Sequence, residues 1–255
     1  MIGIEGLWPH NISPNRLAVL ERKLAVWLRL QMLSESLKTA MTPYKTGEEL
    51  QYLMQQAATE GCNFAPFQLI VNKIVAAKND NFLTLTEIVE LNPLTDFVGA
   101  RLLGVNLSGL DLSGANFQNA YLRGAELSDV DFSNANLVAV NLSGADLSGA
   151  LLSDANLSHA NLHRVSLALA NLSGANLTQV NLTEANLSNC NLSDADLSGA
   201  ILINADLQQA GLALTNLTGA DFTGAKVQQA RLWHDAGLSE EIKQDLIQRG
   251  AIFES

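Results

Sequence analysis

The sequence predicts an α+β multidomain chain: an N-terminal α-helical domain, a coil of short β segments joined by tight corners, and a C-terminal helix. Two patterns support this. Apolar residues recur at helical spacing in the first third of the 255 residues. From Phe97 to Leu232 every fifth residue is Leu, Phe or Val, which gives (232 − 97)/5 + 1 = 28 consecutive units. A period of five fits neither a strand nor an α-helix. We place the boundaries at 1–94, 95–234 and 235–255.

The N-terminal domain is expected to hold four short amphipathic helices. Ser13 before Pro14 is a typical helix start, because Ser caps the first turn and Pro fits it. Pro43 stops the first periodic run. The expected helices run from Pro14 to about Ala40, from Thr46 to just before Gly61, from about Pro66 through Val75, and from about Thr86 to Asn92.

Each five-residue unit has the same internal order around its Leu or Phe centre. The unit 145–149 is typical: Ala lies two positions before the centre, Asp or Asn one before, Ser one after and Gly two after. One large and one small apolar residue per unit suit a narrow interior. Asn, Asp and Gly are turn formers. The units are therefore expected to alternate inward apolar positions with outward corners.

This order resembles the pentapeptide-repeat protein family, whose consensus is A(D/N)LXX, and the resemblance covers residues 95–234. It implies a right-handed quadrilateral β-helix with four units per coil, hence 28/4 = 7 coils. Residues twenty apart would then stack, with Phe97 on Phe117.

Both ends of such a rod would expose apolar interior and unpaired strand edges. We expect the helical domain to close the first end. At the other end Ser239 is an expected N-cap with Glu240 and Glu241 in the first turn, followed by the apolar residues Ile242, Leu246 and Ile247. The segment 251–253 is expected to be an apolar plug. With both ends closed, we expect a monomer.

Four units per coil define four faces, numbered here by their centres: first (97 to 217), second (102 to 222), third (107 to 227) and fourth (112 to 232). The second face departs most from the repeat. It carries the candidate partner-contact residues Arg101, Leu103, Tyr121, Arg123, His163, Arg164, Ile201 and Ile203. Arg and Tyr among exposed aliphatic residues are typical of interface hot spots.

Other readings of this face remain open. The part from Arg101 to Arg123 could instead dock the helical domain on the first coils. The part from His163 to Ile203 could instead be neutral variation.

The fourth face is acidic, with Asp111, Asp131, Asp154 and Asp194 as candidate residues. Stacking of Asp111 on Asp131 could raise a pKa. Rods of the family that inhibit DNA gyrase imitate duplex DNA, so the resemblance allows a DNA-mimicking regulator of a topoisomerase as an alternative. Ordinary surface charge for solubility also explains these residues.

The sequence argues against several other classes. Residues 96–234 hold 5 Lys and Arg against 12 Asp and Glu, which disfavours nucleic-acid binding. No stretch is long and apolar enough for membrane insertion, and no secretory signal is recognisable, so a cytoplasmic location is expected. The two cysteines, Cys62 and Cys190, lack metal-ligand spacing, and Cys190 falls at a small inward position. No catalytic constellation or cofactor motif is found.

The expected function is therefore a non-enzymatic protein-interaction scaffold with an unknown protein partner. The resemblance is strongest to cyanobacterial-type members, which join such rods to accessory domains. No metal, cofactor or catalytic residue is expected.

Overall fold

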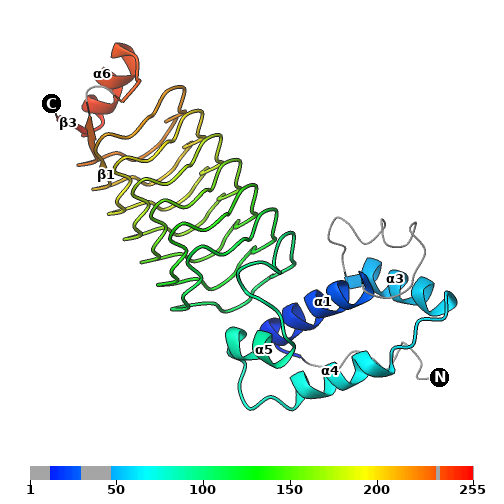
Figure 1. The fold of residues 1–255 in the computed structure, drawn as a ribbon. Helices are drawn as coiled ribbons and strands as arrows, with labels where there is room; N and C mark the ends of the chain where they lie inside the picture. Colours follow the sequence, from blue (N-terminus) through cyan, green and yellow to red (C-terminus); the bar gives the residue numbers. More distant parts are fainter. Residues whose placement is uncertain (1–11, 30–46, 234–235, 255) are drawn as a thin grey trace.

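The computed structural model describes residues 12–29, 47–233 and 236–254. Its helices near the N-terminus are α1 (Pro14–Arg29), α3 (Gly47–Thr59), α4 (Ala65–Val75) and α5 (Phe82–Ile88). Helix α1 packs against α4 and α5, and α5 lies beside the first turns of the repeat region (Figure 1). The helical region therefore occupies one end of the rod.

Helix boundaries follow the capping residues. The Ser13 hydroxyl accepts a hydrogen bond from the Arg16 amide at 3.3 Å, as expected for an N-cap. The expected continuation of this helix to Ala40 falls in 30–46, outside the described residues.

The prediction of a helix from Thr86 to Asn92 was wrong by several residues. Asn81 caps α5 by accepting from the Thr84 amide at 3.1 Å, so the helix starts earlier. It ends earlier because Glu90 has a positive φ of 58° and the Leu91 amide turns back to the Thr86 carbonyl at 2.9 Å.

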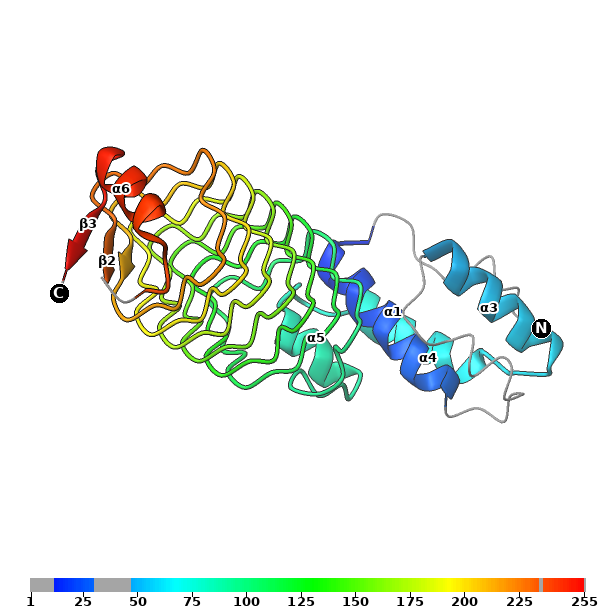
Figure 2. The same cartoon turned by 90° about the horizontal axis from the view of Figure 1, so that it is seen from above.

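From residue 95 the chain winds into a coil whose successive turns pair in parallel (Figure 2). Each bridge joins residues twenty apart, beginning with Arg101 and Tyr121. The Tyr121 amide donates to the Ala100 carbonyl at 2.8 Å, and the Leu122 amide donates forward to the Asn141 carbonyl at 2.7 Å. Backbone groups are thus paired both with the coil before and with the coil after, and the predicted twenty-residue stacking is confirmed.

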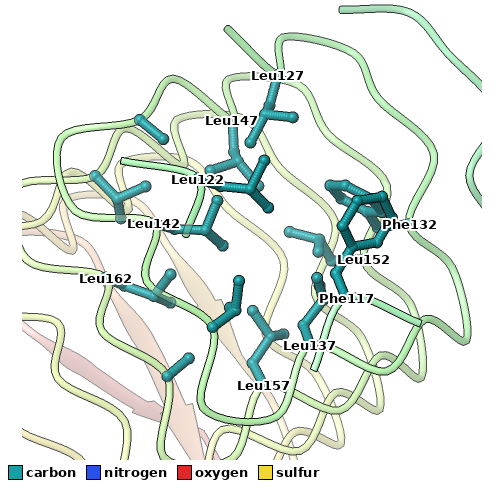
Figure 3. Packing of buried hydrophobic residues seen from close by; sticks show 14 of the residues in the cluster. Phe117, Leu122, Leu127, Phe132, Leu137, Leu142, Leu147, Leu152, Leu157 and Leu162 are labelled. Atoms are coloured by element: carbon teal, nitrogen blue, oxygen red, sulfur yellow. The ribbon is translucent and has the colours of Figure 1, made fainter. Parts of the chain in front are cut away.

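The interior is a column of stacked apolar side chains (Figure 3). All 28 centre residues from Phe97 to Leu232 are at most 6% exposed. Phe97 and Phe117 stack as predicted, with ring centroids 5.8 Å apart, and Phe82 of α5 packs on Phe97 at 5.0 Å. Burying a leucine contributes about 1.5–3 kcal/mol, so this column is the main stabilising feature of the rod.

The described corners share one backbone feature, a positive φ. From position 99 to position 229, all (229 − 99)/5 + 1 = 27 residues two after a centre have a positive φ. In the unit of Leu122 the Ala125 amide closes the turn on the Leu122 carbonyl at 3.1 Å, with the positive φ at Gly124. A positive φ only at the third turn residue is the type II pattern, which favours Gly or Asn. Leu169 and Leu214 nevertheless adopt it.

The C-terminal part extends the ladder. Strands β1 (Gly211–Leu212), β2 (Arg231–Trp233) and β3 (Ile252–Glu254) pair in parallel in that order, and α6 (Glu240–Gln248) lies between β2 and β3 in sequence. Ser239 caps α6 as predicted, accepting from the Ile242 amide at 3.3 Å.

The apolar plug expected at 251–253 is present only in part. Ala251 is buried and Phe253 packs partly buried against the core, but Ile252 belongs to the outer strand β3 and is 46% exposed. Of the three apolar α6 residues only Leu246 is buried, whereas Ile242 and Ile247 are partly exposed.

Candidate functional site

The first group of predicted contact residues on the second face divides in two. Arg101 is half-buried and interacts electrostatically with Glu21 of α1. Burial raises the pKa of the Glu21 carboxyl, and the positive charge of Arg101 partly offsets that rise. Arg101 therefore faces the helical region, as the docking alternative expects.

The other members of this group face solvent. Leu103 is 43% exposed and Tyr121 is 48% exposed, and Arg123 is exposed as well. Leu103 follows the centre Leu102, and on the next coil Tyr121 and Arg123 lie on either side of the centre Leu122. An aliphatic, an aromatic and a cationic side chain thus lie next to one another on the rod surface. Arg123 has no ion-pair partner among the described residues.

The middle group makes contacts within the rod. Arg164 Nε lies 2.7 Å from Glu184 Oε2 of the next coil, and this bond raises the pKa of Arg164 and lowers that of Glu184. His163 Nδ1 lies 3.0 Å from the Thr183 carbonyl. Both side chains therefore already have partners, and Arg164 also holds an unfavourable positive φ of 56°.

The last group is aliphatic. Ile201 is 39% exposed and bridges Asn181 and Asp221, while Ile203 is half-buried. Leu103 and Ile203 are five coils apart, which corresponds to about 24 Å at ~4.8 Å per coil. The eight predicted residues thus share a face without forming one patch, and only Leu103, Tyr121 and Arg123 are adjacent and exposed.

The acidic residues of the fourth face are also dispersed. Asp111 and Asp131 bridge as neighbours, but Asp154 and Asp194 occupy corner positions two coils apart, with Gly174 between them. The expectation of a raised pKa was wrong for Asp111. The Ser113 hydroxyl and amide donate to its carboxylate at 2.7 Å and 3.0 Å and lower its pKa.

The described residues contain no cluster of His, Cys, Asp or Glu that could hold a metal ion. Cys190 is buried, and burial raises the pKa of its thiol to about 12, which agrees with its prediction as a small core residue. Among the described helices, none has the length and apolar character that a membrane crossing requires.

Three exposed leucines and a surface hollow lie outside the residues predicted from the sequence. Leu151, Leu169 and Leu214 are 44%, 71% and 59% exposed. A hollow of about 570 Å3 lies where the third and fourth faces meet, lined by Asn189, Gln209, Gln229, Arg231 and Ile252. For Leu169 and Leu214 the available signal was a leucine at a corner position, where the repeat places Gly, Asn or Asp. Leu151 instead replaces the Asn or Asp that usually precedes a centre.

The sequence pattern described as pentapeptide repeats (8 copies) matches residues 95–134, 135–174, 170–209 and 202–233, more than half of the chain. The chain belongs to the pentapeptide-repeat family. Its repeat region is accordingly a right-handed quadrilateral β-helix, preceded by a helical region. No curated protein matches it at a significant level.

Solved pentapeptide-repeat proteins resemble the repeat region. HetL, involved in heterocyst differentiation regulation in the cyanobacterium Nostoc sp. strain PCC 7120, is 30% identical over 59% of this chain and 76% of its own, with a TM-score of 0.44. Rfr23 from the cyanobacterium Cyanothece 51142 is 34% identical over 37% and 85%, with a TM-score of 0.33. The plasmid-mediated fluoroquinolone resistance protein QnrB1 is 18% identical over 58% and 86%, with a TM-score of 0.28.

Proposed function

We propose that this pentapeptide-repeat protein is a non-enzymatic scaffold that binds another protein through Leu103, Tyr121 and Arg123 on the second face. The observation that carries the proposal is that these three side chains are exposed on adjacent coils. Tyr and Arg are among the residues enriched at interface hot spots, and an aliphatic neighbour adds apolar area. Arg101 belongs to the junction with α1 on this proposal.

The proposal includes seven coils over residues 95–234, with residues 1–94 and 235–255 as separate end pieces that close the rod. Contacts at both ends support it. Phe82 packs on Phe97 at the first coil, and the Arg249 guanidinium donates to the Phe222 and Ala225 carbonyls at 3.2 Å and 3.0 Å at the last. Because closed ends disfavour stacking of rods, we propose a monomer.

We also propose a reducing, cytoplasmic setting. Its support is that Cys62 and Cys190 are both free thiols.

Photo-crosslinking in cells tests the contact surface. A photoreactive residue at position 123 should capture a protein that the same residue at Thr178 does not, because Thr178 occupies the same repeat position on the first face. With the purified partner, Tyr121→Glu and Arg123→Glu should each weaken binding at least tenfold, while Thr178→Glu should not. If Tyr121→Glu and Arg123→Glu bind the partner as tightly as Thr178→Glu does, the proposal is contradicted.

The DNA-mimic alternative makes a different prediction. Added protein should inhibit supercoiling by gyrase, and replacing Asp111, Asp131, Asp154 and Asp194 by Asn should abolish that inhibition. The dispersion of these carboxylates, with Asp111 held by Ser113, weakens this alternative. A supercoiling assay with no inhibition eliminates it.

A further inference from the structure

The hollow between the third and fourth faces is formed by side chains of the rod corner. One wall is a column of corner amides, Asn189, Gln209 and Gln229, and Arg231 and Ile252 lie at its C-terminal end. Gly211 stands in the neighbouring fourth-face column, bridged to Asn191 on one side and Arg231 on the other. A Cβ atom at Gly211 would meet nothing closer than 4.0 Å, so the missing side chain leaves open space.

The same corner carries two exposed leucines directly below the hollow. Leu169 precedes Asn189 in the column of corner residues, and its amide donates to the Ser188 carbonyl at 3.1 Å. The Gly149 amide donates to the Ala168 carbonyl at 2.9 Å, so Leu169 lies next to Gly149 on the neighbouring coil. Gly149 in turn is two residues before Leu151 in the sequence. Leu169 is the most exposed large apolar side chain among the described residues, at 71%. It also holds a φ of 62°, which costs about 1 kcal/mol for a residue with a Cβ atom.

Negative charge continues the corner beyond the leucines. Asp131, one coil before Leu151, forms a parallel bridge with it. The Asp129 amide donates to the Ser148 carbonyl, which puts Asp129 next to Gly149. Neither carboxylate pairs with a cation in the described part of the chain. Along the rod, the corner therefore changes from carboxylates to leucines to amides.

We propose that this corner, from Asp129 and Asp131 to Ile252, binds an extended polypeptide segment in which basic residues lie on one side of an aliphatic or aromatic residue. Lys or Arg of the segment pairs with the two carboxylates, and the apolar residue covers Leu151 and Leu169. The surface is separate from Leu103, Tyr121 and Arg123, so this partner is a second one.

The hollow suits the main chain of such a segment. A carboxamide both donates and accepts, so Asn189, Gln209 and Gln229 can pair with peptide N–H and C=O groups in turn. The corner from Asp129 to Ile252 spans six coils, about 29 Å at ~4.8 Å per coil. An extended chain rises ~3.3 Å per residue, so about nine residues fill it.

Selection from a random twelve-residue peptide library displayed on phage, with the full-length protein as target, tests the proposal. Enriched peptides should carry Lys or Arg on one side of an aliphatic or aromatic residue. Affinity of the best peptide is then measured by fluorescence polarisation on variants. Leu169→Gly should weaken binding at least tenfold by removing the apolar contact.

The variants are chosen so that lost binding does not reflect lost folding. Gly is favoured at a positive φ, so Leu169→Gly should not lower the thermal midpoint. Leu214→Gly is the matched control, because Leu214 is an exposed corner leucine with a φ of 56° between the fourth and first faces. It should bind the peptide like wild type.

Several outcomes overturn the proposal. These are no enrichment, enrichment of acidic peptides, or equal binding to wild type and Leu169→Gly. A dimer of the protein in sedimentation that Leu169→Gly dissociates would assign the surface to a second copy of this chain and would also overturn it.

Discussion

At the junction between α1 and the first coil, one side chain, Asn15, pairs with the open backbone edge of the rod. Within the rod, Glu126 pairs both of its backbone groups with the preceding coil: its amide donates to the Val105 carbonyl at 2.9 Å, and its carbonyl accepts from the Leu107 amide at 2.8 Å. Asn106 lies one coil earlier, at the open edge. The Asn15 carboxamide accepts from its amide at 2.8 Å and donates to its carbonyl at 3.0 Å. One side chain thus replaces the missing coil.

Asn15→Asp isolates the donor half of this arrangement. The carboxylate keeps the bond from the Asn106 amide but loses the donor to the carbonyls of Asn106 and Asp80, the latter 2.8 Å away. Asn15 is only 7% exposed. A buried carbonyl without a donor costs about 1–3 kcal/mol, so two cost about 2–6 kcal/mol. Because water can reach an edge carbonyl, we expect the lower part of that range, about 2–3 kcal/mol.

Hydrogen–deuterium exchange of α1 and the first coil measures this loss. The control is Asn156→Asp, because the Asn156 side chain only accepts, from the Ser158 amide at 3.1 Å, and Asp does this equally well. We expect a change within about 0.5 kcal/mol for the control. If Asn15→Asp exchanges no faster than Asn156→Asp, Asn15 does not replace the missing coil.

Three further predictions concern the rod. Leu162→Ala, at a fully buried centre, should lower the free energy of unfolding in urea by about 2–5 kcal/mol. Ser113→Ala should raise the pKa of Asp111 in an NMR titration. That folded-state pKa is depressed, so its stabilising contribution is present above the unfolded pKa and is lost as pH falls through the folded value. Gly104→Ala should lower stability by about 1 kcal/mol through backbone strain alone. Gly149→Ala should lower it by more, because the added Cβ would also meet the Asp129 carboxylate of the preceding coil. Thermal melts compare the two variants.

The repeat region was predictable because its signal is local and repeated. Each centre from Phe97 to Leu232 is buried, since a five-residue period assigns every position an inward or outward direction. The Phe97–Phe117 stack followed from counting twenty residues. The same counting put the eight candidate contact residues on one face, but it could not separate exposed Tyr121 from half-buried Arg101.

What the sequence could not predict depends on contacts between distant segments. Asn15 and Arg249 pair with backbone groups of the first and last coils, and no repeat pattern extends to either residue. Ile252 is an apolar residue of the kind usually buried in a core, but it lies on the outer strand β3 and is exposed. The lowered pKa of Asp111 reflects a bond to Ser113 two residues away, which is a local feature that a stacking argument left out.

The corner positions show how surface function can be separated from folding in this protein. The backbone imposes a positive φ at every described corner from position 99 to position 229, so Gly, Asn and Asp fit at little cost and a leucine does not. Neither Leu169 nor Leu214 gains burial in return, at 71% and 59% exposed. Strain and exposure are thus common to both, and they do not distinguish a binding surface from drift. Only the corner of Leu169 also carries a second exposed leucine, two carboxylates without cation partners in the described residues and a hollow lined by amides. That coincidence is the reason we assign a partner to the corner of Leu169 and use Leu214 as its control.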